Sequence, residues 1–437
     1  MTILFNRTQT VHLTPKPTAM ILSHLAETLI GSEIVKLAGE IREKIRKGEN
    51  IYNYTVGDFD PEIFGIPKEL EEEIIQAYRS GFTNYPAAEG NLDLRESVSV
   101  FMKNFQGLDY KTDEILVASG GRPLIYSFFR AVADKGDGVL YPVPSWNNNH
   151  YTHFVEGTHI VVEASPENKF MPTAADLAPY IQKATVLALC SPQNPTGTTF
   201  GKPELEAICD LVIAENKRRG DDEKKLYVMY DQMYGHLTYG DIRHYDPVSL
   251  RPEMKPYTVY IDAISKVFSA TGVRVGWCMG PAGIIGKMKA ILTHVGAWAP
   301  MAEQKACARF MLKTDAINKF LDNYRAEAEE RLQRIYGGFM KLKEAGLPVD
   351  AIAPEAGIYL TIKIDCAGKT TSSGAVLHTQ ADVTAYLLNE ARLALVPFSA
   401  FGAASNSPWY RLSIGTCKKE TICSMFDVLG EALKKLQ

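Results

Sequence analysis

Residues 262–277 read DAISKVFSATGVRVGW and place Lys266 and Arg274 between two short β-rich segments, 259–261 and 273–279. A lysine at the end of a buried strand is partly desolvated, which lowers the pKa of its amine and leaves a neutral nucleophile. Such an amine forms a Schiff base with an aldehyde, and an arginine fork close by suits a phosphate. Because the chain holds 47 lysines and arginines, the pair alone also allows a surface lysine beside a strand.

The bulk composition indicates a globular protein. With 437 residues, 46% of them hydrophobic and 22% charged, the chain suits two domains or one large α/β unit with an appendage. A net charge of −4 offers no basic excess for nucleic acid or an anionic membrane. The 7 scattered cysteines, without a CxxC pair, argue against a disulfide framework or a zinc site. No apolar run fits a signal peptide or a membrane span, so we expect a cytoplasmic location.

Apolar runs recur along the chain at the spacing of βαβ units. We predict strands over residues 114–118, 138–141, 159–163, 185–190, 226–230, 259–263 and 409–414, and helices over 32–48, 67–79, 92–105, 123–133 and 302–342. The last helix carries charged runs, and we interpret it as a solvated connector. Residues 363–380 are predicted to be a loop. This pattern predicts an α/β fold with a mostly parallel sheet flanked by helices.

Polar residues gather just after several of these strands. Gly120, Gly121 and Arg122 stand at a strand-to-helix turn, where free N–H groups hold an anion, although tight geometry alone also explains the glycines. Asn194 follows one strand and Asp231 ends another. In an open, mostly parallel sheet this edge is where ligands bind.

Taken in order, these residues resemble a known family. Asn194-Pro-Thr-Gly, Asp231 with Tyr234, Ser265-Lys266, Arg274 and Arg411 are similar to the motifs of the class I/II, aspartate aminotransferase-like enzymes of pyridoxal-phosphate fold type I. The resemblance runs from about residue 57 to residue 411. It implies a large cofactor-binding domain over 55–320 and a smaller α/β domain built from both chain ends, 1–54 and 321–437.

The resemblance also implies an activity. The cofactor is pyridoxal 5′-phosphate, the substrates are an L-amino acid and a 2-oxo acid, and the amino group moves between them by a ping-pong mechanism. Lys266 carries the cofactor as an internal aldimine and then moves a proton at the substrate α-carbon. Asp231 pairs with the pyridine nitrogen, so that the ring accepts electrons. Asn194 and Tyr234 hydrogen-bond the ring's 3-oxygen, and Trp146 stacks on the ring.

The remaining positions are carried over in the same way. The resemblance assigns the phosphate to Arg274, Ser265, the turn at Gly120, Gly121 and Arg122, and to Tyr85 of a neighbouring subunit, which implies a homodimer with shared active sites. It assigns the substrate carboxylate to Arg411, with Asn194 and Gly57 beside it. Relatives carry Ser or Thr three residues before the lysine, whereas this chain has Ala263, so we expect one phosphate hydrogen bond to be missing.

Simpler readings of the single residues stay open. Asp231 also fits a helix N-cap, Tyr234 and Trp146 fit core aromatics, and Arg411 fits a surface ion pair. His150 and His153 resemble a ligand pair without a third ligand.

The same motifs serve a C–S lyase, another elimination or a decarboxylase, so they do not fix the reaction. A non-enzymatic, aminotransferase-like ligand sensor is a further alternative, but the chain has only a short arm before the family-like region and is not basic. The substrate is open as well. One branch binds a distal carboxylate through an arginine after the lysine motif, and residues 275–308 contain none, although an arginine elsewhere could serve. Trp298 and His294 in that segment favour an aromatic or neutral side chain.

Overall fold

The structure is a computed structural model that describes residues 22–29, 31 and 33–437. The chain divides into two compact units, residues 1–31 and 32–437. In the first unit the described residues form the short helix α1 (His24–Glu27), whose N-cap Ser23 accepts a hydrogen bond from the amide of Ala26. The predicted arm, residues 1 to about 17, lies outside the described residues.

A seven-stranded sheet organises the second unit, in the order β2-β8-β7-β6-β5-β3-β4. Its strands are β2 (Ile115–Ala118), β3 (Gly138–Val143), β4 (Thr158–Glu163), β5 (Ala184–Cys190), β6 (Tyr227–Asp231), β7 (Thr258–Ala263) and β8 (Gly276–Met279). Only β8 runs against its neighbours, since it pairs antiparallel with both β2 and β7 while the other pairs are parallel. The predicted mostly parallel sheet is confirmed.

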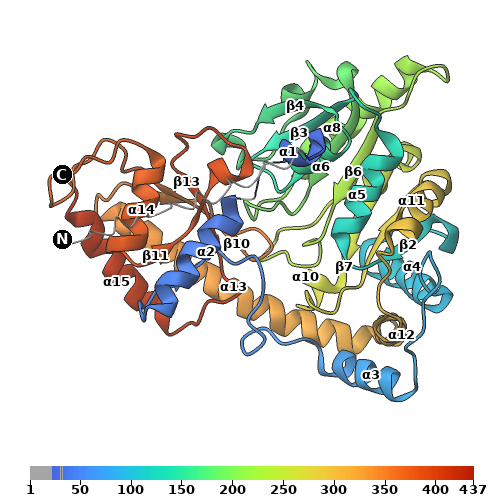
Figure 1. The fold of residues 1–437 in the computed structure, drawn as a ribbon, viewed down its shortest axis with the longest axis horizontal. Coiled ribbons are helices and arrows are strands. Elements are labelled where there is room, and N and C mark those ends of the chain that lie inside the picture. The colour runs from blue at the N-terminus through green and yellow to red at the C-terminus, as the bar shows by residue number, and fades with distance from the viewer. Residues whose placement is uncertain (1–21, 30, 32) are drawn as a thin grey trace, which may run out of the picture. The chain divides into compact units, whose positions relative to one another are not determined.

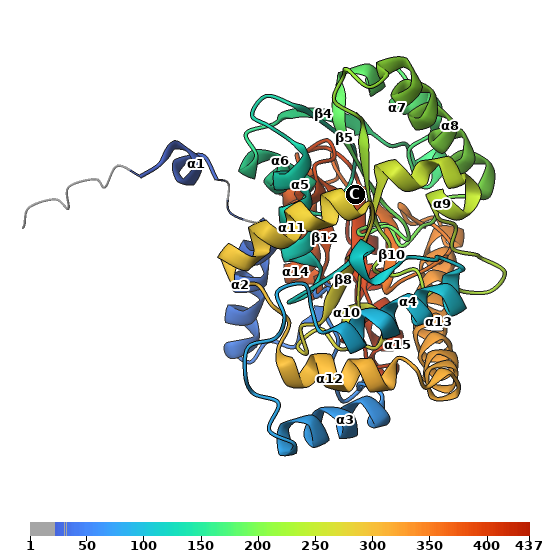
Figure 2. The same ribbon diagram turned by 90° about the vertical axis from the view of Figure 1, so that its right-hand side faces the viewer.

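Helices cover both faces of this sheet because its strands are apolar on both sides. In β7, Val259 and Ile261 point into one core and Tyr260 points into the other. The first core takes α5 (Gly121–Val132), α6 (Asn148–Phe154) and α11 (Ala282–Val295), and Figures 1 and 2 show α5 and α11 side by side. The second takes α4 (Leu92–Gln106) and α8 (Lys202–Arg219).

A second group of elements comes from both ends of the unit. Strands β9 (Val349–Ala351), β10 (Tyr359–Ile364), β12 (Val396–Pro397) and β13 (Trp409–Ser413) form an antiparallel sheet, and β1 (Tyr52–Asn53) pairs parallel with β11 (Leu393–Ala394). The helices α2 (Glu33–Arg46), α14 (Gln380–Glu390) and α15 (Thr421–Lys434) lie around these strands in Figure 1. The smaller α/β part predicted from the two chain ends is therefore present.

The expected helix over residues 302–342 was wrong in two respects. The segment forms two helices, α12 (Met301–Phe310) and α13 (Thr314–Glu344), and α12 packs against α3 (Lys68–Arg79) (Figure 2). It is also no solvated connector, because α13 buries a stripe that includes Ile317, Leu321 and Tyr324. These apolar positions recur at helical spacing, but charged residues stand between them. The charged residues led to the prediction of a solvated helix, although one face of it is apolar.

The shorter elements complete the described chain. They are α7 (Ala174–Leu177), α9 (Pro247–Leu250), α10 (Ile264–Val267), and the 3-10 turns η1 (Thr112–Glu114), η2 (Pro166–Asn168), η3 (Ile181–Lys183), η4 (Pro252–Tyr257) and η5 (Phe398–Phe401). Across the part of the chain that the structure describes, no helix combines the length and the apolar character that crossing a membrane requires.

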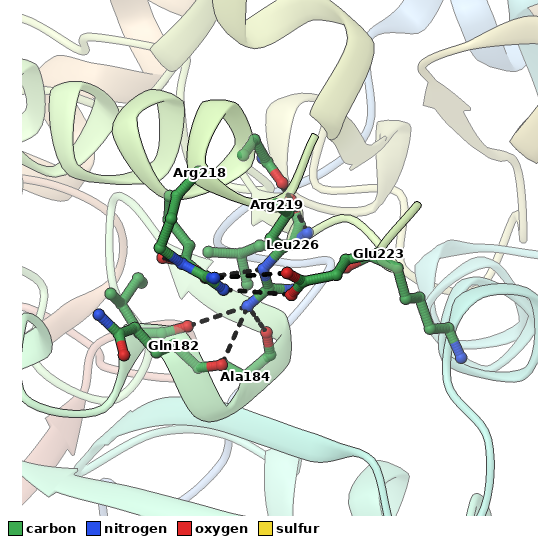
Figure 3. Close-up of polar contacts among 10 residues, drawn as sticks. Gln182, Ala184, Arg218, Arg219, Glu223 and Leu226 are labelled. Carbon is green, nitrogen blue, oxygen red and sulfur yellow. Dashed lines mark hydrogen bonds and ion pairs between the residues drawn. The ribbon is translucent and has the colours of Figure 1, made fainter. Parts of the chain in front are cut away.

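Buried Arg219, in the last turn of α8, ties this helix to the sheet (Figure 3). Its Nε donates to Glu215 at 2.8 Å, and its Nη2 donates to the carbonyls of Gln182 and Ala184 at 3.3 and 2.8 Å. Because β5 begins at Ala184, these bonds fix the start of a central strand whose far end leads to Asn194.

Candidate active site

A cavity of about 550 Å³ opens where β6 and β7 end. Its lining includes Gly57, Asp58, Gly121, Arg122, Trp146, Asn194, Asp231, Tyr234, Ser265, Lys266, Thr271, Arg274, Tyr359 and Arg411. The fold thus brings into one cavity most of the site residues that the sequence predicts, from segments far apart in the chain. Of the predicted residues, Gly120 and Tyr85 do not line it.

Lys266 lies in the short helix α10, which begins directly after β7. Its Nζ donates to the carbonyl oxygen of Gly57 at 2.7 Å. Burial lowers the pKa of the amine to about 8; Asp58 opposes this effect, and the charges of three arginines add to it. A useful fraction of the amine is therefore neutral near neutral pH, as a nucleophile or a general base requires.

Asp231 is the last residue of β6, and its Oδ1 accepts a hydrogen bond from the amide of Met233 at 3.0 Å. No lysine, arginine or histidine among the described residues forms an ion pair with it. Burial raises the pKa of its carboxyl group to about 6, and the Met233 amide opposes this effect. A half-buried carboxylate without a cation fits a ligand that brings its own positive charge, such as a protonated ring nitrogen.

The turn from β2 into α5 forms an anion cradle with Arg274. Its Nη2 donates to the carbonyl of Ser119 at 2.8 Å, and its Nη1 donates to that of Thr271 at 2.6 Å. Gly120 has φ +91°, and a Cβ there would lie 2.2 Å from Nη2 of Arg274. Only glycine therefore lets the guanidinium approach the first turn of α5, where free N–H groups favour an anion.

The structure bears on the missing hydroxyl at Ala263. The Ala263 amide donates to the carboxylate of Asp262 at 2.7 Å, so this residue offers neither a hydroxyl nor a free N–H. The hydroxyl-bearing residues Ser265 and Thr271 line the cavity. Thr271 already donates to Asp58 at 2.5 Å, which leaves Ser265 as the better placed donor for a phosphate.

Arg411 on β13 is a buried cation that lacks a carboxylate partner among the described residues. Its Nη1 donates to Oδ1 of Asn194 at 3.1 Å and its Nη2 to the carbonyl of Thr55 at 2.7 Å, while its Nε has no partner in the described part of the chain. A ligand carboxylate fits this arrangement. The bond to Arg411 also fixes the Asn194 side chain with its NH₂ group free to donate elsewhere.

Two more predicted residues meet at the mouth of the cavity. The guanidinium carbon of Arg122 lies 4.7 Å from the ring centroid of Trp146. Arg122 is exposed and forms no ion pair with any carboxylate in the described residues. The pair presents an aromatic face and an unpaired cation to the same cavity.

Some predicted residues stand apart from the cavity in this chain. Tyr85 is 83% exposed and packs edge-on against Trp298 at a centroid distance of 5.4 Å. Both line a separate surface hollow, and His294 lies in the last turn of α11. His150 and His153 belong to no cluster of three metal-binding side chains among the described residues.

The sequence analysis missed Tyr359, Asp58 and Thr271 as lining residues. The hydroxyl of Tyr359 lies 2.7 Å from that of Tyr234, and Arg411 stacks on its ring. Tyr359 is on β10, which pairs antiparallel with the strand of Arg411. In the sequence, β10 and β13 are two separate β-rich runs. Neither run indicates that the two strands pair and bring Tyr359 next to Arg411.

The cavity fits pyridoxal phosphate by its own chemistry. Lys266 supplies an amine for the aldehyde, and Asp231 is an uncompensated carboxylate for the ring nitrogen. The glycine cradle with Arg274 suits the phosphate. Together, the amine, the carboxylate and the anion cradle match a ligand that carries an aldehyde, a protonated ring nitrogen and a phosphate.

Comparisons with known proteins agree with this geometry. Residues 47–429 match the family described as aminotransferase class I and II. The chain is 29% identical over 411 residues to a probable aspartate/prephenate aminotransferase of Rhizobium leguminosarum bv. phaseoli, covering 93% of this chain and 95% of the relative. A relative of the same description from Rickettsia typhi is 30% identical over 405 residues, covering 92% and 96%. The crystal structure of the aspartate aminotransferase from Rhizobium meliloti superposes with a TM-score of 0.86 at 25% identity, covering 96% of this chain and 100% of that chain.

Proposed function

Because the chain belongs to the class I and II aminotransferases and is a pyridoxal-phosphate-dependent transaminase, we propose that it works by ping-pong exchange on the cavity around Lys266. The amino acid gives up its amino group and leaves as a 2-oxo acid before the accepting 2-oxo acid binds. The observation that carries this assignment is the meeting of an amine of lowered pKa with a half-buried carboxylate that has no cation partner among the described residues, in one cavity.

The cofactor, when bound, supplies an electron sink for the negative charge that develops at the substrate α-carbon. Lys266 takes the proton from that carbon and returns one in the reverse half-reaction, for which a pKa of about 8 is suitable. Asp231 keeps a proton on the ring nitrogen through a charge-assisted hydrogen bond. Asn194 and Tyr234 donate hydrogen bonds to the 3-oxygen, and Trp146 limits the tilt of the ring.

Arg411 binds the α-carboxylate of the substrate. It is buried, it has an unpartnered Nε, and two of its other contacts, to Asn194 and Thr55, hold the guanidinium in place. Gly57 leaves room beside it, because a Cβ there would lie 2.8 Å from the Tyr359 hydroxyl and 3.6 Å from Nη1 of Arg411. The carboxylate therefore approaches a fixed fork instead of a flexible side chain.

We further propose acidic amino acids among the donors. Relatives are named aspartate/prephenate aminotransferases. An acidic donor needs a cation for its distal carboxylate, and residues 275–308 after the lysine motif contain no arginine. Arg122 is the cation that remains for this task, since Arg274 belongs to the cradle and Arg411 to the α-carboxylate. Its position over Trp146, exposed and unpaired, supports a role at the substrate side chain in place of the phosphate role inferred from the turn.

The assembly and the domain boundaries are proposals as well. A homodimer is supported by the exposed Tyr85 and its neighbour Trp298, which line a surface hollow; in such a dimer Tyr85 of one copy serves the phosphate of the other. We place the large domain at residues 55–320 and the small domain at 1–54 and 321–437, as the pairing of β1 with β11 supports. We expect the enzyme to act in the cytoplasm.

Absorbance spectroscopy tests the function directly. Purified protein with added pyridoxal phosphate should show a band near 420 nm that bleaches on adding an acidic amino acid, and Lys266→Ala should lose the covalently bound species. Formation of more than one equivalent of 2-oxo acid per site only when an acceptor is present separates transamination from the C–S lyase and decarboxylase alternatives. A protein that forms no band, or that makes 2-oxo acid over many turnovers without an acceptor, contradicts the proposal.

A further inference from the structure

Tyr234 and Tyr359 form a closed pair of hydroxyl groups inside the cavity. Their oxygen atoms are 2.7 Å apart, their rings pack edge-on at 5.4 Å, and both side chains are almost fully buried. Within the described part of the chain, neither hydroxyl has another hydrogen-bond partner. If Tyr234 donates its proton to another group, the hydroxyl of Tyr359 must therefore be the donor in the bond between the two tyrosines.

A phenol hydroxyl has only one proton to donate. If Tyr234 donates that proton to the 3-oxygen of the cofactor, its own oxygen can still accept, and the Tyr359 hydroxyl is the donor within reach. A donor that itself accepts a hydrogen bond donates more strongly, because the two bonds polarise each other in a buried site. The pair is thus arranged as a relay from Tyr359 through Tyr234 toward the cofactor.

The ring of Tyr359 makes a second contact. The guanidinium carbon of Arg411 lies 4.6 Å from its centroid, so the residue that binds the substrate carboxylate rests on the ring whose hydroxyl supports Tyr234. The other charged or titratable groups near the pair are Asp58 and Cys190 at Tyr359, Tyr324 at Tyr234, and Lys266, whose Nζ lies 5.8 Å from the ring centroid of Tyr234. Among the described residues, none of these groups forms a hydrogen bond with either hydroxyl, so Tyr359 is the direct partner of Tyr234.

We propose that Tyr359 is a positioning residue with two separable roles: its hydroxyl directs the proton of Tyr234 to the cofactor, and its ring holds Arg411 for the substrate carboxylate. This inference rests on the proposed function, because it assumes that Tyr234 donates to the 3-oxygen. A hydrogen bond to that oxygen stabilises negative charge there and loosens the proton on the nitrogen that joins Lys266 to the cofactor. Removing the support should therefore raise the pKa at which the absorbance of the bound cofactor changes.

The experiment titrates the absorbance of the holoenzyme for the wild type, Tyr359→Phe, Tyr234→Phe and the double variant. We expect Tyr234→Phe to raise this spectroscopic pKa by about 1 and Tyr359→Phe to raise it by about 0.3, since the second effect is only the polarisation of the first bond. In the double variant the pKa should equal that of Tyr234→Phe, because the relay has no other route. Tyr386→Phe is the matched control: it also removes a buried tyrosine hydroxyl that donates a hydrogen bond, to the Ala432 carbonyl at 2.7 Å, but it lies in α14 outside the cavity.

Substrate kinetics separate the two roles. Tyr359→Phe keeps the ring and should leave the KM for the amino acid within about twofold, whereas Tyr359→Leu removes the ring and should raise the KM about fivefold or more. An unchanged spectroscopic pKa in Tyr359→Phe, or a shift that adds to that of Tyr234→Phe, overturns the relay. An unchanged KM in Tyr359→Leu overturns the role of the ring. A wild-type protein that forms no absorbance band at all contradicts the proposed function instead.

Discussion

Replacing Asp231 by Asn should stabilise the cofactor-free protein at pH 8. The carboxylate lies in a site that favours its neutral form, because burial raises the pKa of the group from an ordinary value near 3.8 to about 6. A folded state with a raised carboxyl pKa binds protons more tightly than the unfolded chain. Its stability therefore falls as the pH rises from about 4 to about 6, and it stays lowered above that range.

The size of this effect follows from the two pKa values. The difference between 3.8 and about 6, at 1.36 kcal/mol per unit, is about 3 kcal/mol at pH 8. About half of this penalty is already present at pH 5, where the folded carboxyl group is mostly protonated but the unfolded one is not. Asn cannot ionise, and its oxygen can still accept the hydrogen bond of the Met233 amide. The variant should thus gain about 3 kcal/mol at pH 8 and about 1.5 kcal/mol at pH 5.

Urea unfolding of the cofactor-free protein at the two pH values measures this difference. Asp210→Asn is a suitable control, because Asp210 is a surface carboxylate paired with Arg251 at 2.7 Å and its pKa is lowered, so its loss should be neutral or slightly destabilising. Added pyridoxal phosphate should reverse the ranking, since the wild type gains binding energy that the variant lacks. A stability gain of the same size at both pH values, or none at pH 8, would refute the account of Asp231 as a half-buried charge without a cation partner.

Three further changes test other parts of the structure. Arg219→Met should destabilise the protein by about 2 kcal/mol in urea unfolding, because the buried carbonyls of Gln182 and Ala184 lose their donor while Arg218 still pairs with Glu215; an unchanged stability would contradict the arrangement in Figure 3. Gly57→Ala should raise the KM for amino acids about tenfold with the cofactor still bound, since the new Cβ would lie 2.8 Å from the Tyr359 hydroxyl; an unaffected KM argues against a fixed fork at Arg411. Arg122→Gln should lower kcat/KM for aspartate about 10- to 100-fold and change that for a neutral amino acid little, and equal losses for both would assign Arg122 to the phosphate.

The large sheet was predictable because its signals are local. Each strand is a short apolar run that ends in a polar or turn residue, so Asp231 and Lys266 could be placed at one edge from the sequence. The observed strand bounds differ from the predicted ones by a few residues at most. The prediction was possible because βαβ connections make neighbouring strands parallel, so that their carboxyl ends lie at the same edge of the sheet.

The rest of the site depends on pairings that are distant in the chain. Arg411 reaches the cavity because β13 pairs with β10, where Thr361 is the partner of Arg411, and nothing in either run specifies that register. Gly57 contacts Lys266 from a loop that has no regular structure to predict it. The buried stripe of α13 was missed for a different reason: the charged residues of this helix indicate a solvated helix unless the helical spacing of the apolar residues is considered.

The charges around the cavity explain why Lys266 is ready to react in the free protein. Arg122, Arg274 and Arg411 line the cavity with Lys266, and the lining carboxylates are Asp58 and Asp231. The arginines lower the pKa of the lysine amine, in addition to burial, so its neutral form is favoured while they are unpaired. A phosphate at Arg274 and a carboxylate at Arg411 would cancel part of that effect and favour the proton on Lys266. Anion binding therefore raises the pKa of the Lys266 amine, so that it holds more firmly a proton taken from the substrate α-carbon.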